Sequence, residues 1–192
     1  MSNLDFRCLS AVVILIASQV VLLRLPVVSG IVSPGILKQL IPVIGLGLLF
    51  GLIATAFHWK RLRNTGDLPM PETANPTELH AALGFGLLFV VVLLCSAWLS
   101  DVAGSGGLYL VAIASGLTDV DAITLSSLRL FQMDKLSSEQ AVISIAIAIA
   151  FVSNMAFKFG LAVSIGGMAL AKHIAVGFVA ITTGVALGLL FL

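Results

Sequence analysis

The chain has 192 residues, of which 59% are hydrophobic and 10% charged, and its formal net charge is +1. Soluble domains contain about 45 to 50% apolar and about 25% charged residues, so this composition is that of an integral membrane protein. It leaves no room for an aqueous catalytic domain, and no block of Lys and Arg suggests nucleic acid as a partner. We therefore expect one transmembrane domain over residues 1–192, with the lipid bilayer as its surroundings.

The first part of the chain predicts two membrane-spanning helices. The first covers about residues 8–23, with Arg7 before it and Arg24 after it, and turn-forming residues 26–34 follow. We interpret it as a retained anchor because its apolar stretch is long and Arg24 and a proline follow directly, unlike a cleaved secretory signal. The second span covers about residues 37–57.

A polar segment then separates these two spans from the next. Residues 58–76 contain the basic cluster and most of the prolines, which predicts a cytoplasmic loop. The third span covers about residues 78–99. Asn75 and Thr77 are both candidates for its N-cap.

The fourth apolar run, residues 108–130, is interrupted by two acids. It has 23 residues and would be roughly 34 Å long as a helix, which places Asp119 and Asp121 near the membrane midplane. An ionised carboxylate there costs about 2.5 to 3.5 kcal/mol on insertion scales. Residues two apart also lie on opposite sides of a helix. Because Gly116 favours a break and Thr118 or Asp119 can cap a new half-helix, we predict a discontinuous span broken between Gly116 and Asp121.

Two further spans complete the predicted bundle. The fifth begins near residue 140 and carries Asn154 and Lys158, which are four apart and share a helix face. The glycine-rich residues 159–171 are either a re-entrant segment or a kinked extension, and the last span covers about residues 174–192. The fold class is therefore an all-α, polytopic integral membrane helix bundle of about six spans, within a range of five to seven. Gly47 with Gly51 and Gly184 with Gly188 form two GxxxG spacings, which allow close helix packing.

The distribution of positive charge predicts the orientation. With six spans, six of the ten Lys and Arg residues lie on the side that carries both ends of the chain. Because cytoplasmic loops are enriched in Lys and Arg, we expect a multi-pass protein of the inner (cytoplasmic) membrane with both termini in the cytoplasm.

Carboxylates, hydroxyls and unwound carbonyls are the ligands that ions need inside a membrane. We assign Asp119 and Asp121 as ion-binding or coupling residues, and as the metal ligands if the ion is a divalent cation. A Lys158 ion pair with an intramembrane Asp would offset most of the burial cost, and a competing cation could displace that pair. The residues expected at this site are Asp119, Asp121, Thr118, Thr124, Asn154 and Lys158, with Ser115, Glu78 and Asn75 as accessory residues.

Each of these residues also has a structural alternative. Asp119 would act only as an N-cap, Asp121 and Asn154 as hydrogen-bonding residues between helices, and Lys158 as a side chain that reaches the headgroups. Glu78 would lie at the interface. No Ser/His/Asp or paired-His pattern suggests catalysis, so we do not expect an enzyme, and a bound cation is the only expected ligand.

Four motifs resemble a known family. They are Asn75-Pro76-Thr77-Glu78-Leu79, Gly107-Leu-Tyr-Leu110, Gly116-Leu-Thr-Asp119-Val-Asp121-Ala-Ile-Thr124 and Ser153-Asn154-x-x-x-Lys158. Over residues 75–170 the chain resembles the integral membrane domain of unknown function found C-terminal to MgtC/SapB domains, although the MgtC/SapB domain itself is not evident.

That resemblance has implications for partners and function. The family carries a related Gly-Leu-x-Ser-Ser-Thr-Ala motif in an earlier half, whereas this chain has only the acidic copy. If the site forms between two such repeats, it implies a homodimer or a second small membrane subunit with the complementary half-motif. It also implies membrane transport of a cation or small solute, with Asp119, Asp121, Asn154 and Lys158 as the matching residues.

Three functions fit these observations. The leading hypothesis is a subunit of a proton- or sodium-coupled secondary cation transporter. The second is a non-transporting membrane regulator or divalent-cation sensor that acts through a partner protein. The third is an exporter of a small organic solute.

Overall fold

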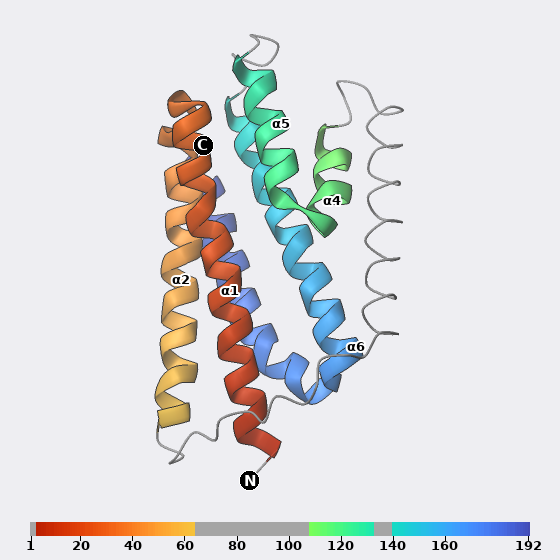
Figure 1. Cartoon of the computed structure of the whole chain (residues 1–192). Helices are drawn as coiled ribbons and strands as arrows, with labels where there is room; N and C mark the ends of the chain where they lie inside the picture. Colours follow the sequence, from red (N-terminus) through yellow and green to blue (C-terminus); the bar gives the residue numbers. More distant parts are fainter. Residues whose placement is uncertain (1–2, 64–107, 133–139) are drawn as a thin grey trace.

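A computed structural model describes residues 3–63, 108–132 and 140–192, and this part of the chain folds into helices joined by short turns (Figure 1). Prediction of an all-helical fold is therefore confirmed for these residues. The elements are α1 (Asn3–Val32), the 3₁₀ turn η1 (Pro34–Ile36), α2 (Leu37–Arg63), α4 (Leu108–Thr118), α5 (Val120–Gln132) and α6 (Gln140–Leu189).

Helix α1 is longer than the predicted first span. It passes through Arg24 and Pro26 and ends at Val32, and the Ser33 N–H donates to the Ser29 carbonyl over 2.7 Å. A proline inside a helix removes one N–H donor, but membrane helices tolerate it because neighbouring helices and local adjustments satisfy the freed groups. The prediction that residues 26–34 are irregular is therefore wrong except at the turn around Pro34, and Arg24 lies inside the span.

Helices α1 and α2 form an antiparallel pair. Gln19 Nε2 donates a hydrogen bond of 2.6 Å to Thr55 Oγ1, and both residues are buried. Beyond this bond the contacts are apolar, with Leu22, Leu25, Leu40, Val43 and Ile44 in the buried core. The predicted second span is confirmed in position, and the helix continues into the start of the segment predicted as a loop, as far as Arg63.

Helix α6 consists of two arms that meet at Gly167. Its 50 residues would be about 75 Å long if straight, roughly twice the thickness of a bilayer. Gly167 has φ 72° and ψ 172°, a left-handed conformation that glycine adopts without the steric cost of a Cβ. Figure 1 shows α6 turning back on itself here. The glycine-rich residues are thus a kinked extension rather than a separate segment.

The two GxxxG spacings meet each other across α2 and the second arm of α6. A Cβ on Gly47 would lie 2.7 Å from Val185 Cγ2, and one on Gly51 would lie 2.9 Å from Ile181 Cγ1. From the other side, Gly184 faces the Leu46 carbonyl and Gly188 faces the backbone at Val43. The absent side chains let the two backbones approach closely, as the spacing predicted.

The outer surface of α1, α2 and α6 is largely apolar. α1, α2 and α6 are long and apolar enough to cross a membrane by length and composition. Large side chains project from them into the surroundings, among them Ile31 at 79%, Ile165 at 70% and Phe57 at 70% exposure. Exposed apolar surface on this scale fits a helical bundle embedded in lipid.

The two ends of the described chain lie at opposite ends of this bundle (Figure 1). The second arm of α6 runs beside α1, since Gly177 packs on Leu15 near the first half of α1 and Gly188 packs on Val43 near the start of α2. Leu189 therefore ends near the α1–α2 turn, whereas Asn3 lies at the far end of α1. This arrangement does not support the expectation that both termini share one side.

Candidate functional site

The predicted break in the fourth span is present, and it changes the path of the chain. α4 ends at Thr118, α5 begins at Val120, and Asp119 between them is not helical. α4 has 11 residues and α5 has 13, so each is about 16 to 20 Å long, half the length needed to cross a bilayer. The two helices fold back against each other in a V, with both outer ends toward the same end of the bundle (Figure 1). The sequence predicted that the two halves form one interrupted span that crosses the membrane. This part of the prediction is wrong, because the chain turns back at the break instead of continuing in the same direction.

The tip of the V lies deep within the bundle. A Cβ on Gly116 would collide with the backbone of Ala150, which is ten residues, or about 15 Å, along α6 from Gln140. The first arm of α6 is about 40 Å long, so the tip lies near its middle. Irregular backbone at this depth is tolerated where protein buries it or where it lines a cavity.

Asn154 anchors the tip to α6. Its side chain is 8% exposed, and Nδ2 donates a hydrogen bond of 3.1 Å to the Gly116 carbonyl. The last carbonyls of a helix have no partner within it, so this bond satisfies one of the free acceptors at the end of α4. The structural alternative for Asn154, a hydrogen bond between helices, is confirmed.

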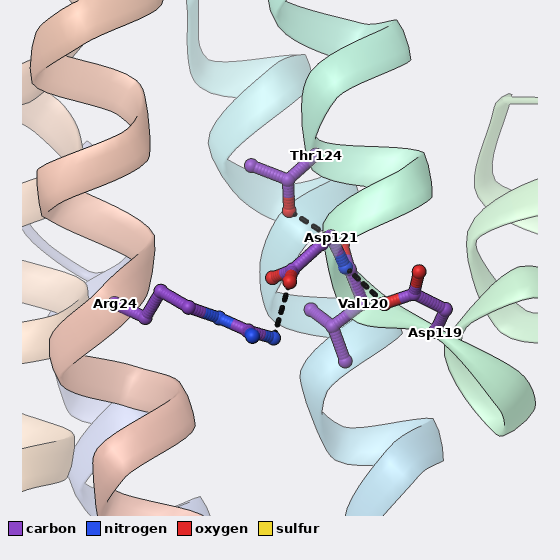
Figure 2. Close-up of polar contacts among 5 residues, drawn as sticks. All are labelled: Arg24, Asp119, Val120, Asp121 and Thr124. Atoms are coloured by element: carbon purple, nitrogen blue, oxygen red, sulfur yellow. Dashed lines mark hydrogen bonds and ion pairs between the residues drawn. The ribbon is translucent and has the colours of Figure 1, made fainter.

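Asp119 is the N-cap of α5. Its Oδ1 accepts a hydrogen bond of 2.9 Å from the Asp121 N–H, which has no acceptor within the helix (Figure 2). The carboxylate also lies at the positive end of the helix dipole. The capping role predicted as the alternative for Asp119 is confirmed, and its side chain is exposed in this arrangement.

Asp121 forms an ion pair with Arg24 of α1 (Figure 2). The two carboxylates point to different sides of the start of α5, with Asp121 toward α1 and Asp119 away from it. Asp121 Oδ1 is buried and has no hydrogen-bond partner among the described residues, so only one of its oxygens is engaged. An acceptor that is left free in this way is available to a proton, an ion or water.

The sequence pointed to Lys158 rather than Arg24 as the counter-charge. Arg24 was assigned to the flank of the first span because an Arg at the end of an apolar run is ordinary. The signal that could have identified it is the continuing apolar run beyond Pro26, which places Arg24 eight residues inside α1. Lys158 forms no ion pair within the described ranges, and the partner of Asp121 there is Arg24. The predicted pairing between Lys158 and an Asp is therefore absent there.

The hydroxyl groups at the tip bond within their own helices. Thr118 Oγ1 donates to the Ser115 carbonyl over 3.0 Å, and Thr124 Oγ1 donates to the Val120 carbonyl over 2.7 Å. Thr124 is fully buried one turn above Asp121. Asn75 and Glu78 lie outside the described residues. Among residues 3–63, 108–132 and 140–192, no three His, Cys, Asp or Glu side chains group in a way that could hold a metal ion.

The fold and the site together define a helical bundle of the membrane type, built around a pair of half-length helices whose tip carries an Arg–Asp ion pair. Residues 2–166 match a family described as a domain of unknown function (DUF4010), and the chain belongs to this family. The match agrees with the resemblance drawn from residues 75–170 and extends it to the N-terminal helices.

A comparison with one relative shows what share of that protein's length this chain matches. An uncharacterized protein of Aquifex aeolicus (strain VF5) is 31% identical over 127 residues, which cover 66% of this chain and 53% of that protein. The chain thus matches about half the length of this curated relative. No solved structure matches the chain.

Proposed function

We propose that this chain is a subunit of an ion-coupled membrane transporter, in which Asp121 is the coupling carboxylate and Arg24 its exchangeable partner. The observation that carries the proposal is the ion pair between α1 and the point where two half-helices meet, partway along the bundle. Charged side chains at membrane depth are costly and mark ion pathways and proton relays. Discontinuous helices that meet near the midplane are also how many secondary transporters build their sites.

The proposed chemistry is an exchange of partners at Asp121. With the site empty, the Arg24 guanidinium balances the carboxylate charge. A proton or a sodium ion that reaches the free Oδ1 would take over this role and release Arg24. Because Arg24 belongs to α1 and Asp121 to α5, this exchange changes the attraction between two helices, which is the kind of coupling that alternating access requires.

Asp119, Asn154 and Gly116 would hold the tip in place during this exchange. Asp119 caps α5, and Asn154 ties α4 to α6. Under this proposal the site takes a monovalent cation, and the protein is not an enzyme.

The wider setting is also part of the proposal. We place the chain in the inner membrane, associated with a second copy of itself or with a small subunit that carries the complementary half-motif. About six membrane segments are expected if residues 78–99 cross the bilayer and the V of α4 and α5 is counted as one. An association with MgtC/SapB domains stays a prediction from the resemblance.

The test is cation flux in liposomes that contain the purified protein. We expect proton- or sodium-dependent flux that Asp121→Asn reduces to the level of empty liposomes and that Asp121→Glu retains in part. Ser164→Ala is the control, because this hydroxyl only donates to the Gly160 carbonyl on an exposed part of α6. If the protein is correctly folded and its flux does not depend on Asp121, the transport proposal fails and a regulatory role becomes the better explanation.

A further inference from the structure

One face of the bundle carries charge where lipid would be expected. It is formed by α1 and α5 on either side of the Arg24–Asp121 pair, and we refer to it as the α1–α5 face. Arg24 is 52% exposed and the Asp121 side chain 23%. Arg24 lies eight residues, or about 12 Å, inside α1 from Val32, well below the end of the apolar span.

The α5 half of this face is polar. The exposed residues of the Asp119–α5 segment that the structure describes are all small or polar, and they follow one another at helical spacing: Asp119, Ala122, Ser126 and Arg129. Lipid-facing helix surfaces are apolar, whereas this one resembles the surface of a helix that faces protein or water.

The α1 half shows the pattern of a helix–helix contact. Five of its exposed apolar side chains are 46% to 59% exposed and follow one another at alternating spacings of three and four residues: Val13, Ile16, Val20, Leu23 and Val27. β-Branched residues at the first of these positions and Leu or Ile at the second are typical of a two-helix seam. Arg24 directly follows Leu23 in the sequence and therefore flanks this apolar seam. Charged residues at such flanking positions pair across the two helices.

We propose that the α1–α5 face is the interface with a second copy of this chain, so that the ion-coupling site is enclosed only in the dimer. The face exposes both signs of charge, with Asp119 and Arg129 on α5 and the half-exposed Arg24 on α1, and a surface with both signs can complement its own copy about a two-fold axis. The assignment of the Arg24–Asp121 pair as an ion-coupling site rests on the proposed function, whereas the proposed contact between two copies does not.

The experiment is cysteine cross-linking in native membranes. Cys8 and Cys95 are first replaced by Ala, and single cysteines are introduced as Ala122→Cys on α5 and Val20→Cys on α1. Both positions are exposed on the α1–α5 face. The matched control is Val179→Cys, which is 65% exposed on the second arm of α6 beside an apolar groove between the two arms. A short bis-maleimide should convert most of the Ala122→Cys and Val20→Cys protein to a covalent dimer and leave Val179→Cys monomeric.

Three results would overturn the inference. If Val179→Cys gives the dimer and the two face variants do not, the copies meet at the α6 groove instead. If Ala122→Cys stays monomeric but reacts with a membrane-impermeant maleimide, the face lines a water-filled cavity. If it neither cross-links nor reacts, another part of the same chain or lipid covers the face.

The outcome is independent of transport. Cross-links without Asp121-dependent flux would overturn the transport proposal alone, and flux without cross-links would overturn this interface alone. If Ala122→Cys dimers no longer form when Val20→Trp is added to the same chain, the contact is located at the α1 seam.

Discussion

The two acids at the tip of the V, two residues apart, have different surroundings and therefore different roles. Asp119 accepts a backbone N–H at the start of α5, whereas Asp121 pairs with Arg24 on another helix. Their opposite directions follow from helix geometry, because residues two apart lie about 200° apart around the axis. The described residues therefore do not present two carboxylates that converge on one divalent ion.

The capping role of Asp119 leads to a prediction at the scale of the residue. Asn caps a helix about as well as Asp, but Ala does not. We expect Asp119→Asn to leave the melting temperature of the purified protein nearly unchanged and Asp119→Ala to lower its stability by about 1 kcal/mol. Thermal unfolding in detergent measures both. Equal destabilisation by the two substitutions would instead show that the negative charge of Asp119 matters.

At the scale of the element, the V depends on a close contact between α4 and α6. Gly116 lies against the backbone of Ala150, and a backbone cannot move aside as a side chain can. We expect Gly116→Ala to destabilise the protein by about 1 to 3 kcal/mol, through overpacking, and to weaken the Asn154 bond to the same residue.

The matched control for this substitution is on the helix that Gly116 touches. Gly160 is also helical, and apart from its chain neighbours and the adjoining backbone of its own helix no atom lies within 4 Å of a Cβ placed on it. Gly160→Ala should therefore leave stability unchanged or raise it by up to about 1 kcal/mol, because Ala is the better helix former. Unfolding in detergent compares the two, and a similar effect of both substitutions would mean that the α4–α6 contact is not tight.

At the scale of the whole molecule, the V bears on how many times the chain crosses the bundle between its two ends. A helix pair that enters and leaves from one side adds no crossing, whereas a straight span would. Arg7 near the start of α1 and Lys60, Arg61 and Arg63 near the end of α2 lie at one end of the bundle, opposite Leu189.

This arrangement predicts the topology. Because cytoplasmic ends are rich in Lys and Arg, we expect the N-terminus in the cytoplasm and the C-terminus on the opposite side. Reporter fusions that are active on only one side of the membrane measure this at each terminus. A C-terminal fusion that reports the cytoplasm would contradict the V-shaped path of α4 and α5.

Much of the bundle could be predicted from the sequence because local signals determine it. Apolar runs of sufficient length predicted α1, α2 and both arms of α6, and the two GxxxG spacings predicted close packing. The break near Asp119 was also predictable, since acids in an apolar run need a cap or a partner. These features depend on residues close to one another in the chain.

What only the tertiary structure decided is how the segments lie relative to each other. A break at Asp119 is compatible with both a straight span and a V, because the choice depends on what α4 and α5 pack against rather than on their own residues. The partner of Asp121 was likewise undetermined, since Arg24 is 97 residues away in the sequence and reaches it only because α1 packs beside α5. The sequence by itself thus determined that two acids interrupt an apolar run and that Asp119 can cap a new helix there, because both features are local. The packing of α1 beside α5 decided that Asp121 is half of an ion pair.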